Sequence, residues 1–396
     1  MKEIEGGICA VAGVSAYGVK EGKYGLAVIL AEGPAAGMFT RNKIVAAPVV
    51  LTKGLLETRP RLSAVIVNSG NANAFTGEEG LKDARAMGRE LAETLDLDPE
   101  SVGVASTGVI GHRLDLSRIK GQLPGVLKGL EASPAGSLAA AKAIMTTDTF
   151  QKEVAVELKS GIRIGGIAKG SGMIEPNMGT MLSFVYTDAD VPADVLEAAL
   201  REATDLSFNM VVVDGDTSTN DMVLLTATGK SGVKPCMGTL DEFREGLTYV
   251  LTTLAKMVAG DGEGATKLIE ARVKGAKTAE DAKLAAKAIV RSPLVKTAVF
   301  GKDPNWGRVI AAVGYSGAEL DPEKVSLSFA GGAEEVTLVE SGKVSGSSGS
   351  LESLKKVMES EEIIITVDLG LGEEAATAWG CDFSYDYVRI NAEYTT

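Results

Sequence analysis

The sequence predicts a layered protein of the α/β or α+β class, because strand-like and helix-like patterns alternate loosely along the chain. Short apolar runs rich in β-branched residues are typical of buried strands, and longer stretches carry apolar residues at helical spacing. The chain has 396 residues, of which 45% are hydrophobic, so it can bury a sizeable core in two or three domain-sized units.

Five apolar runs predict the strands. In chain order they lie at 64–67, 181–186, 210–213, 222–225 and 363–367. Gly, Asn or Asp residues beside these runs favour turns, which limits each strand to a few residues. The runs therefore indicate short, buried strands spread over most of the chain.

Two amphipathic helices are predicted in the second half of the chain. The stretch 241–258 places six large apolar side chains on one face, and Gly260 stands where a C-terminal cap would be. A second helix is expected to begin at an N-cap, Thr278, and to end before Pro293. The Gly- and Ser-rich stretch 340–350 predicts an exposed connector, and a smaller C-terminal α/β unit is expected at about 291–396.

Charge and hydropathy exclude two classes of partner. The net charge is −13 at pH 7, which repels a phosphate backbone, so we expect no nucleic acid to bind. No apolar run approaches the roughly 20 residues that span a bilayer, so no membrane association is expected. The first residues lack the basic and then apolar order of a signal peptide, and the expected location is cytoplasmic.

Few residues are available for histidine or cysteine chemistry. His112 is the only histidine, so a Ser/His/Asp or Cys/His site would have to use it, and a zinc site would have one imidazole. The three cysteines, Cys9, Cys236 and Cys381, are far apart in sequence and are expected to be reduced core thiols. If the protein is an enzyme, its base is therefore expected to be something other than histidine.

Three motifs suggest other functions. The sequence GDGEGA at 260–265 follows a helix instead of a strand, which excludes a dinucleotide fingerprint, and Lys169-Gly-Ser lacks the glycine spacing of a phosphate loop. Asp214 and Asp216 directly follow an apolar strand and could hold Mg²⁺ in a phosphatase. That alternative stays open, beside the simpler interpretation that these side chains satisfy backbone groups in a polar turn.

The most informative segment approaches an internal threonine. A glycine-rich stretch, 165–179, leads to Gly179 and Thr180, and a predicted strand follows. The small residue 179 leaves its carbonyl accessible to the Thr180 hydroxyl, so attack and hydrolysis would free Thr180 with a new α-amine. Such an amine titrates near roughly 7.7–8.0 and can serve as the base.

Several strings together carry a family resemblance. They are KGSGMI-x-PNM-x-TM at 169–181, VNSGNAN at 67–73, STGVIG at 106–111, MTTDT at 145–149, DGDTSTND at 214–221, GEGATK at 262–267, DPNWGR at 303–308 and YVRINAEYTT at 387–396. In this order they resemble the ornithine acetyltransferases, also called glutamate N-acetyltransferases, over essentially the whole chain. The resemblance implies a layered self-processing fold that is distinct from a Rossmann sheet.

The resemblance also assigns roles to particular residues. Thr180 is implied to be the nucleophile after cleavage between Gly179 and Thr180, with Thr107 and Gly108 as the oxyanion pair. The residues implied to bind the substrate are Thr146, Lys169, Thr180, Glu263, Asn391 and Thr396, and Thr146 is favoured over Thr147. The family usually has alanine where this chain has Gly179, which puts the rate of cleavage in question.

A specific reaction follows from the resemblance. N2-acetylornithine would acylate Thr180, ornithine would leave, and glutamate would take the acetyl group in a ping-pong reaction of arginine biosynthesis. An α chain, 1–179, and a β chain, 180–396, would assemble as α2β2. No metal or organic cofactor is implied, and acetyl-CoA is a candidate donor substrate. A self-cleaving aminopeptidase or amidohydrolase of related fold and a non-catalytic binding protein remain alternatives.

Overall fold

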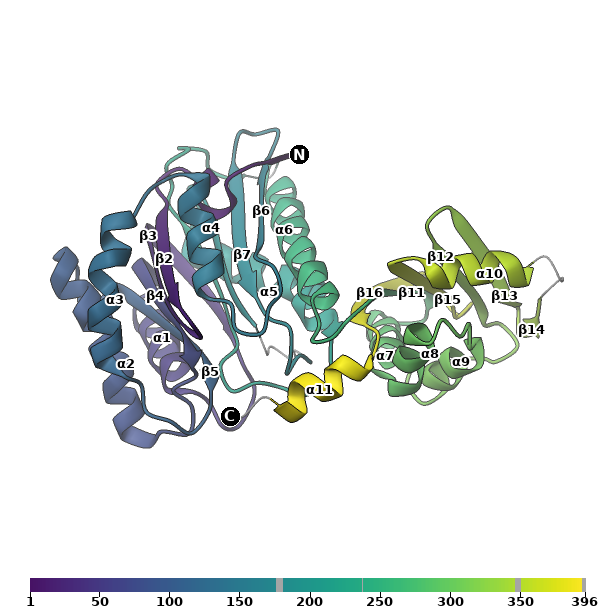
Figure 1. The fold of residues 1–396 in the computed structure, drawn as a ribbon. Helices are drawn as coiled ribbons and strands as arrows, with labels where there is room; N and C mark the ends of the chain where they lie inside the picture. The colour runs from purple at the N-terminus through teal and green to yellow at the C-terminus, as the bar shows by residue number, and fades with distance from the viewer. Residues whose placement is uncertain (176–180, 237, 346–349, 394–396) are drawn as a thin grey trace.

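The computed structural model describes residues 1–175, 181–236, 238–345 and 350–393. Gly179, Thr180 and Thr396 therefore lie outside the described residues. Within the described part, the strands form one nine-stranded and one seven-stranded sheet. Figure 1 shows the larger sheet between layers of helices and the smaller sheet in a separate lobe beside it.

The larger sheet takes most of its strands from the first half of the chain. Its order is β1-β6-β7-β8-β10-β3-β4-β5, and β2 pairs with β3. The strands are β1 (Lys2–Ile4), β2 (Ser15–Glu21), β3 (Tyr24–Phe39), β4 (Arg61–Asn71), β5 (Val102–Val109), β6 (Lys152–Glu157), β7 (Arg163–Lys169), β8 (Leu182–Thr187) and β10 (Met222–Ala227).

The long strand β3 folds this sheet into a sandwich. Its first half pairs with β2 and β4, its last residues pair with β10, and the register shifts between Leu30 and Gly33. A Cβ at Gly33 would lie 1.7 Å from the carbonyl oxygen of Ala227, so only glycine allows the backbones to approach this closely. The two half-sheets share one apolar core, in which side chains of β3, β4 and β5 meet those of β7, β8 and β10.

Helices cover both outer faces of the sandwich (Figure 1). The β3–β4–β5 face packs against α2 and α3, and the β8–β10 face packs against α5 and α6. The helices of this unit are α1 (Ala47–Thr58), α2 (Gly77–Leu95), α3 (Leu116–Gly129), α4 (Pro134–Ala143), α5 (Ala193–Leu206) and α6 (Leu240–Gly260), with 3₁₀ turns η1 (Gly7–Ala10), η2 (Pro99–Ser101) and η3 (Phe208–Met210). The result is an α/β/β/α architecture, which confirms the predicted layered class.

The smaller sheet has the order β14-β13-β12-β15-β11-β16-β9. Its strands are β9 (Val211–Val212), β11 (Leu268–Ala276), β12 (Ser326–Gly331), β13 (Glu334–Glu340), β14 (Lys343–Val344), β15 (Glu362–Asp368) and β16 (Glu374–Cys381). Its helices are α7 (Ala279–Arg291), α8 (Pro293–Phe300), α9 (Trp306–Gly314) and α10 (Ser350–Glu359), and α11 (Tyr385–Glu393) ends the described chain. Strands from both sides of residue 291 thus enter this sheet.

The structure confirms four predicted strands and shortens the fifth. The runs at 64–67, 181–186, 222–225 and 363–367 correspond to β4, β8, β10 and β15. Of the run at 210–213, only Val211 and Val212 pair, with β16. Met210 instead closes the 3₁₀ turn η3, and the N–H of Val213 donates to the carbonyl of Ile174.

Both predicted helices are present, with one difference at a cap. The Thr278 hydroxyl accepts from the N–H of Asp281 at the start of α7, as expected. Gly260, however, is the last residue of α6, and Asp261 caps it with a φ of −96°. The expectation that Gly260 is the cap is therefore wrong by one residue, and the Asp261 side chain is held there by bonds from the N–H of Thr149 and from Lys152 Nζ.

Two further expectations need correction or detail. The three cysteines are free, but only Cys381 is buried, while Cys9 is half-buried and Cys236 is exposed, so they are not all core thiols. Part of the expected connector, Lys343–Val344, pairs with β13 as strand β14. Among the described helices, none combines the length and the apolar character that crossing a bilayer requires.

Candidate functional site

Polar side chains gather where several strands end at one edge of the sandwich. β7 ends at Lys169, β8 begins at Leu182 beside it, and the parallel partner β10 begins at Met222. Residues 176–180, which include the expected nucleophile, lie outside the described residues, and in sequence they stand between the described Glu175 and Met181 at this edge. The side chains around it set the chemistry that the edge can perform.

Lys169 is the central cation of this edge and is only 7% exposed. Its Nζ donates to Thr146 Oγ1 at 2.8 Å and lies 3.9 Å from Asp148 Oδ2. Burial lowers the pKa of the Lys169 ammonium, and the carboxylate of Asp148 opposes that shift most strongly. A buried ammonium with few bonds of its own is suited to receive the carboxylate of a ligand.

A buried ion network supports this lysine from behind. Lys152 Nζ contacts Asp148 Oδ1 at 2.8 Å and Asp261 Oδ2 at 2.5 Å, and all three side chains are nearly inaccessible. Asp148 also accepts from the N–H of Gly170 at 2.6 Å. Burial disfavours the charged form of Asp148, but the ammonium groups of Lys169 and Lys152 outweigh it and hold its pKa below the ordinary value.

The two candidate threonines of the 145–149 string have different partners. Thr146 contacts Lys169, whereas the Thr147 hydroxyl pairs with the Ser171 hydroxyl at 2.6 Å. The structure therefore places Thr146, the residue favoured from the sequence, beside the cation. Asp148, which follows them in sequence and belongs to the ion network, is a residue that sequence reasoning missed, although it stands inside a string already singled out.

Glu263 and Asn391 lie together on the other side of the edge. Asn391 Nδ2, on α11, donates to Glu263 Oε2 at 2.8 Å, and the N–H of Glu263 donates to the carbonyl of Ser171 at 2.8 Å. A Cβ at Gly172 would lie 2.4 Å from the Glu263 carboxylate, so this glycine makes room for the acid. The structure thus joins Glu263 and Asn391 to the segment that follows Lys169.

Thr107 and Gly108 lie at the end of β5, in an irregular pairing with β4. Gly70 and Gly108 have φ values of 96° and 134°, and the register shifts beside Asn71. A Cβ at Gly108 would lie 2.3 Å from the carbonyl carbon of Gly70, which excludes any larger residue there. The pairing of β4 and β5 is therefore irregular where Thr107 and Gly108 lie.

Asn220 connects this bulge to the strand that begins beside β8. Its Nδ2 donates to the carbonyls of Ser106 at 2.8 Å and Ala72 at 2.6 Å. It precedes Asp221, whose carboxyl is fully enclosed next to the N–H of Met181, and burial raises the pKa of Asp221 well above the ordinary value. Both are residues that sequence reasoning missed as members of the site, although they belong to the 214–221 string.

The magnesium interpretation of Asp214 finds no support in these contacts. Both carboxylate oxygens of Asp214 accept backbone N–H groups, from Met173 at 2.6 Å and from Ile174 at 2.8 Å. In the part of the chain that the structure describes, no group of three or more His, Cys, Asp or Glu side chains is placed to hold a metal ion. His112 is exposed, and its carbonyl accepts from Asn71 Nδ2.

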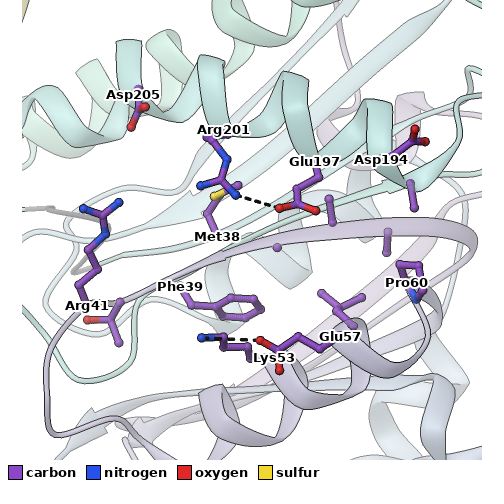
Figure 2. A pocket seen from close by; sticks show the side chains of 16 residues that line it. Met38, Phe39, Arg41, Lys53, Glu57, Pro60, Asp194, Glu197, Arg201 and Asp205 are labelled. Atoms are coloured by element: carbon purple, nitrogen blue, oxygen red, sulfur yellow. Dashed lines mark hydrogen bonds and ion pairs between the residues drawn. The ribbon is translucent and has the colours of Figure 1, made fainter.

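A separate cavity of about 620 Å³ lies between α1 and α5, over the last residues of β3. Figure 2 shows that its charged side chains pair within their own helices, Lys53 with Glu57 and Arg201 with Glu197. None of the site residues predicted from the sequence is among the residues that line it. It is therefore distinct from the polar edge.

Comparisons with known proteins assign the chain to a family. The sequence model described as the ArgJ family matches residues 11–396. The chain is 70% identical to a glutamate N-acetyltransferase of Methanosarcina acetivorans and 50% identical to an arginine biosynthesis bifunctional protein ArgJ of Symbiobacterium thermophilum, with both chains covered completely in each case.

A solved structure agrees with this assignment. The crystal structure of the arginine biosynthesis bifunctional protein ArgJ from Bacillus halodurans matches with a TM-score of 0.51 and 44% identity, over 54% of this chain and all of that chain. Four of the strings that carried the resemblance, at 145–149, 169–181, 262–267 and 387–396, also supply side chains of the polar edge. The chain therefore belongs to the ArgJ family.

Proposed function

We propose that this acyltransferase moves the acetyl group of N2-acetylornithine to glutamate through an acetyl-Thr180 intermediate, after the chain cleaves itself between Gly179 and Thr180. The observation that carries the proposal is the charge arrangement beside β8. A buried ammonium, Lys169, and a carboxylate, Glu263, flank the short segment that follows β7. N2-acetylornithine carries one carboxylate and one side-chain ammonium, which such a pair of opposite charges complements.

Cleavage would begin with attack of the Thr180 hydroxyl on carbonyl 179. The C–N bond then breaks, the amide nitrogen gains a proton to become the α-amine, and residue 179 is left as an ester on the hydroxyl. Water hydrolyses that ester, which frees the hydroxyl and gives residue 179 a carboxylate. No histidine is required, because the new α-amine can accept the proton of its own hydroxyl in later turnovers.

Acetyl transfer would use the same hydroxyl twice. Thr180 attacks the acetyl carbonyl of N2-acetylornithine, and the α-amine passes the hydroxyl proton to the departing ornithine nitrogen. The amine of glutamate then attacks the acetyl-threonine ester and regenerates the hydroxyl. In each step the Thr107 hydroxyl and the Gly108 N–H would stabilise the negative oxygen, which the unusual end of β5 supports.

Substrate recognition follows from the same charges. We assign the α-carboxylate of either substrate to Lys169 and Thr146, and the side-chain ammonium of ornithine to Glu263 with Asn391 beside it. Thr396 belongs to this set by the resemblance. No metal or organic cofactor enters these steps, and acetyl-CoA is a further candidate donor.

The length of a solved relative supports cleavage into two fragments. The Bacillus halodurans chain is matched completely by 54% of this chain, and residues 180–396 make up about the same share. Assembly of the two fragments as α2β2 is part of the proposal. A self-cleaving hydrolase would differ in using water as the final acceptor, so release of free acetate in place of N-acetylglutamate would favour that alternative.

The decisive experiment follows the acetyl group. Cleaved wild-type protein, incubated with N2-acetylornithine alone, should release ornithine in a burst and gain one acetyl group on Thr180, located by intact mass and peptide mapping. Thr180→Ala should stay uncut and inactive, whereas Thr180→Ser retains a hydroxyl and should cleave and turn over more slowly. An acetyl group on another residue, or normal transfer by Thr180→Ala, contradicts the proposal.

A further inference from the structure

The loop 214–221 contacts the residues that precede the proposed cleavage position. Asp214 Oδ2 accepts from the N–H of Met173 at 2.6 Å, and Oδ1 accepts from the N–H of Ile174 at 2.8 Å. Burial raises the pKa of Asp214, while these backbone N–H groups oppose the shift. The carboxylate therefore holds two successive peptide groups at once.

Further backbone bonds lengthen this contact. The N–H of Val213 donates to the carbonyl of Ile174 at 2.7 Å, and the N–H of Glu175 donates to the carbonyl of Asp216 at 2.9 Å. The Thr217 hydroxyl donates to the carbonyl of Glu175 at 3.1 Å. Residues 173–175 are thus held along the loop 214–221, up to Glu175, the last described residue before 176.

Met173 shows that this fixation opposes a local strain. Its φ is 58°, a left-handed conformation that a non-glycine residue rarely adopts, and its side chain is 41% exposed. Because an exposed side chain contributes little packing, the backbone conformation depends on the hydrogen bond from its N–H to Asp214. Stored strain of this kind persists only where the surroundings enforce it.

The same loop also reaches Met181, the second residue after the cleavage position. Asp221 lies against the N–H of Met181, and the N–H of Met222 donates to the carbonyl of Met181 at 3.0 Å. Asp214 and Asp221 are seven positions apart at opposite ends of the 214–221 string. One short loop therefore holds both flanks of residues 176–180.

We propose that Asp214 is a positioning residue for self-cleavage: it fixes the backbone of Met173 and Ile174 ahead of the cleavage position, while Met181 is held beyond it. The inference rests on the proposed function. Attack within one chain is fast only when the reacting atoms are held near contact, and small displacements slow it steeply. In the described residues, Asp214 acts through the backbone N–H groups of Met173 and Ile174.

Asp214→Asn is expected to disturb these contacts, although asparagine has nearly the same size and shape as aspartate. Two separate N–H groups face two separate oxygens, so an asparagine must direct its own NH₂ group at one of them. One of the two peptide groups then loses its acceptor. After cleavage, residue 179 is a free carboxyl end that takes no part in acetyl transfer, so we expect acetyl transfer to depend much less on the Asp214 contacts.

The test measures cleavage and transfer separately. Uncut precursor of wild type, Asp214→Asn and Asp214→Ala is followed by denaturing electrophoresis, and kcat is then measured per cut molecule. We expect cleavage to slow by ~10–100-fold in the Asp214 variants, with kcat per cut molecule close to wild type. A purely structural defect would lower both rates together.

A matched control uses another buried carboxylate. One oxygen of Asp382, Oδ1, accepts from the N–H groups of Thr266 at 2.8 Å and Lys267 at 3.0 Å, and neither of these residues belongs to the segment 173–181. Asp382→Asn should cleave at the wild-type rate. If it slows as much as Asp214→Asn, the effect is general and the inference is wrong.

The remaining outcomes are also decisive. If folded Asp214→Asn and Asp214→Ala cleave at the wild-type rate, the positioning role alone is overturned. If the wild-type chain itself is never cut before Thr180, this inference and the proposed function are overturned together. If the Asp214 variants do not fold, Thr217→Val decides, because it removes only the bond to the carbonyl of Glu175. It should cleave more slowly than wild type, and an unchanged rate rejects the inference.

Discussion

Lys152 carries a charge in a place where water does not reach. Its ammonium contacts Asp148 and Asp261, and its side chain is 0% exposed. A buried ion pair adds little net stability over an apolar equivalent, but removal of one partner leaves an uncompensated charge. Its value here is geometric, because Asp148 also bonds the N–H of Gly170 and lies beside Lys169.

Lys152→Met should therefore lower the free energy of unfolding by about 3–5 kcal/mol, because two buried carboxylates lose their cation. Lys82→Met is the control, since Lys82 pairs with Glu79 at the surface with 68% of its side chain exposed, and it should cost about 0.5 kcal/mol or less. Urea unfolding at neutral pH measures both. Equal effects of the two substitutions would contradict the buried network.

The pH dependence of that cost has a definite sign. The pKa of Asp148 is held below its ordinary value, so its stabilising contribution is present above the unfolded pKa of about 3.9 and is lost as the pH falls through the folded pKa. Without Lys152 the folded pKa must rise. The difference in unfolding free energy between wild type and Lys152→Met should therefore shrink as the pH is lowered below about 4, and a constant difference would exclude this origin.

At the scale of elements, the end of β5 depends on a backbone that only glycine allows. Gly108 has a φ of 134°, and its missing Cβ leaves room for the backbone of Gly70 and Asn71. Gly103 lies in the same strand without a positive φ, and a Cβ there would meet mainly the Leu62 and Val65 side chains at 3.3 and 3.4 Å. Two glycines of one strand thus face very different constraints.

Gly108→Ala should separate β5 from β4 and displace the proposed oxyanion donors, lowering kcat by about 10²–10³, the usual effect of losing one such donor. Gly103→Ala should change kcat little, because side chains can yield where backbone atoms do not. Steady-state kinetics on cut protein, with thermal unfolding as a check on folding, compares them. Similar kcat values for the two variants would exclude a role for the bulge.

At the scale of the whole molecule, the proposed fragments share one sheet. β8 and β10 lie between β7 and β3, so strands that follow residue 180 are inserted among strands that precede it. The sandwich core contains side chains of both groups. Separation of the fragments would therefore break the central ladder and expose the core.

Cut protein should elute as one species under native conditions and separate into two chains only in denaturant. Light scattering during gel filtration should give twice the 41.0 kDa of one chain if the proposed α2β2 assembly forms. An uncut Thr180→Ala chain provides the reference for the mass. Fragments that separate without denaturant would contradict the shared sheet, and a mass of 41.0 kDa would contradict α2β2.

The site could be read from the sequence only in part. Lys169, Thr146, Glu263 and Asn391 were identified by strings around them, and the structure brings them to one edge. Asp148 and Asn220 stood in the same strings but were not identified, because their role is to bond backbone groups distant in sequence. Thr180 and Thr396 lie outside the described residues, and their placement stays a prediction.

The sequence by itself determined the layered class, four of the five strands at their positions, and the helices α6 and α7, because these depend on local apolar spacing and on caps formed by neighbouring residues. It also determined the family, through strings that span the chain. Only the tertiary structure decided that β3 runs through both half-sheets, with Gly33 at the register shift between them. It also decided that the N–H of Val213 bonds Ile174 instead of extending a strand, and that Asp214 holds the backbone of residues 173 and 174. Those features require partners that are adjacent only after folding, and local residue patterns do not specify which partner satisfies a buried hydrogen-bonding group.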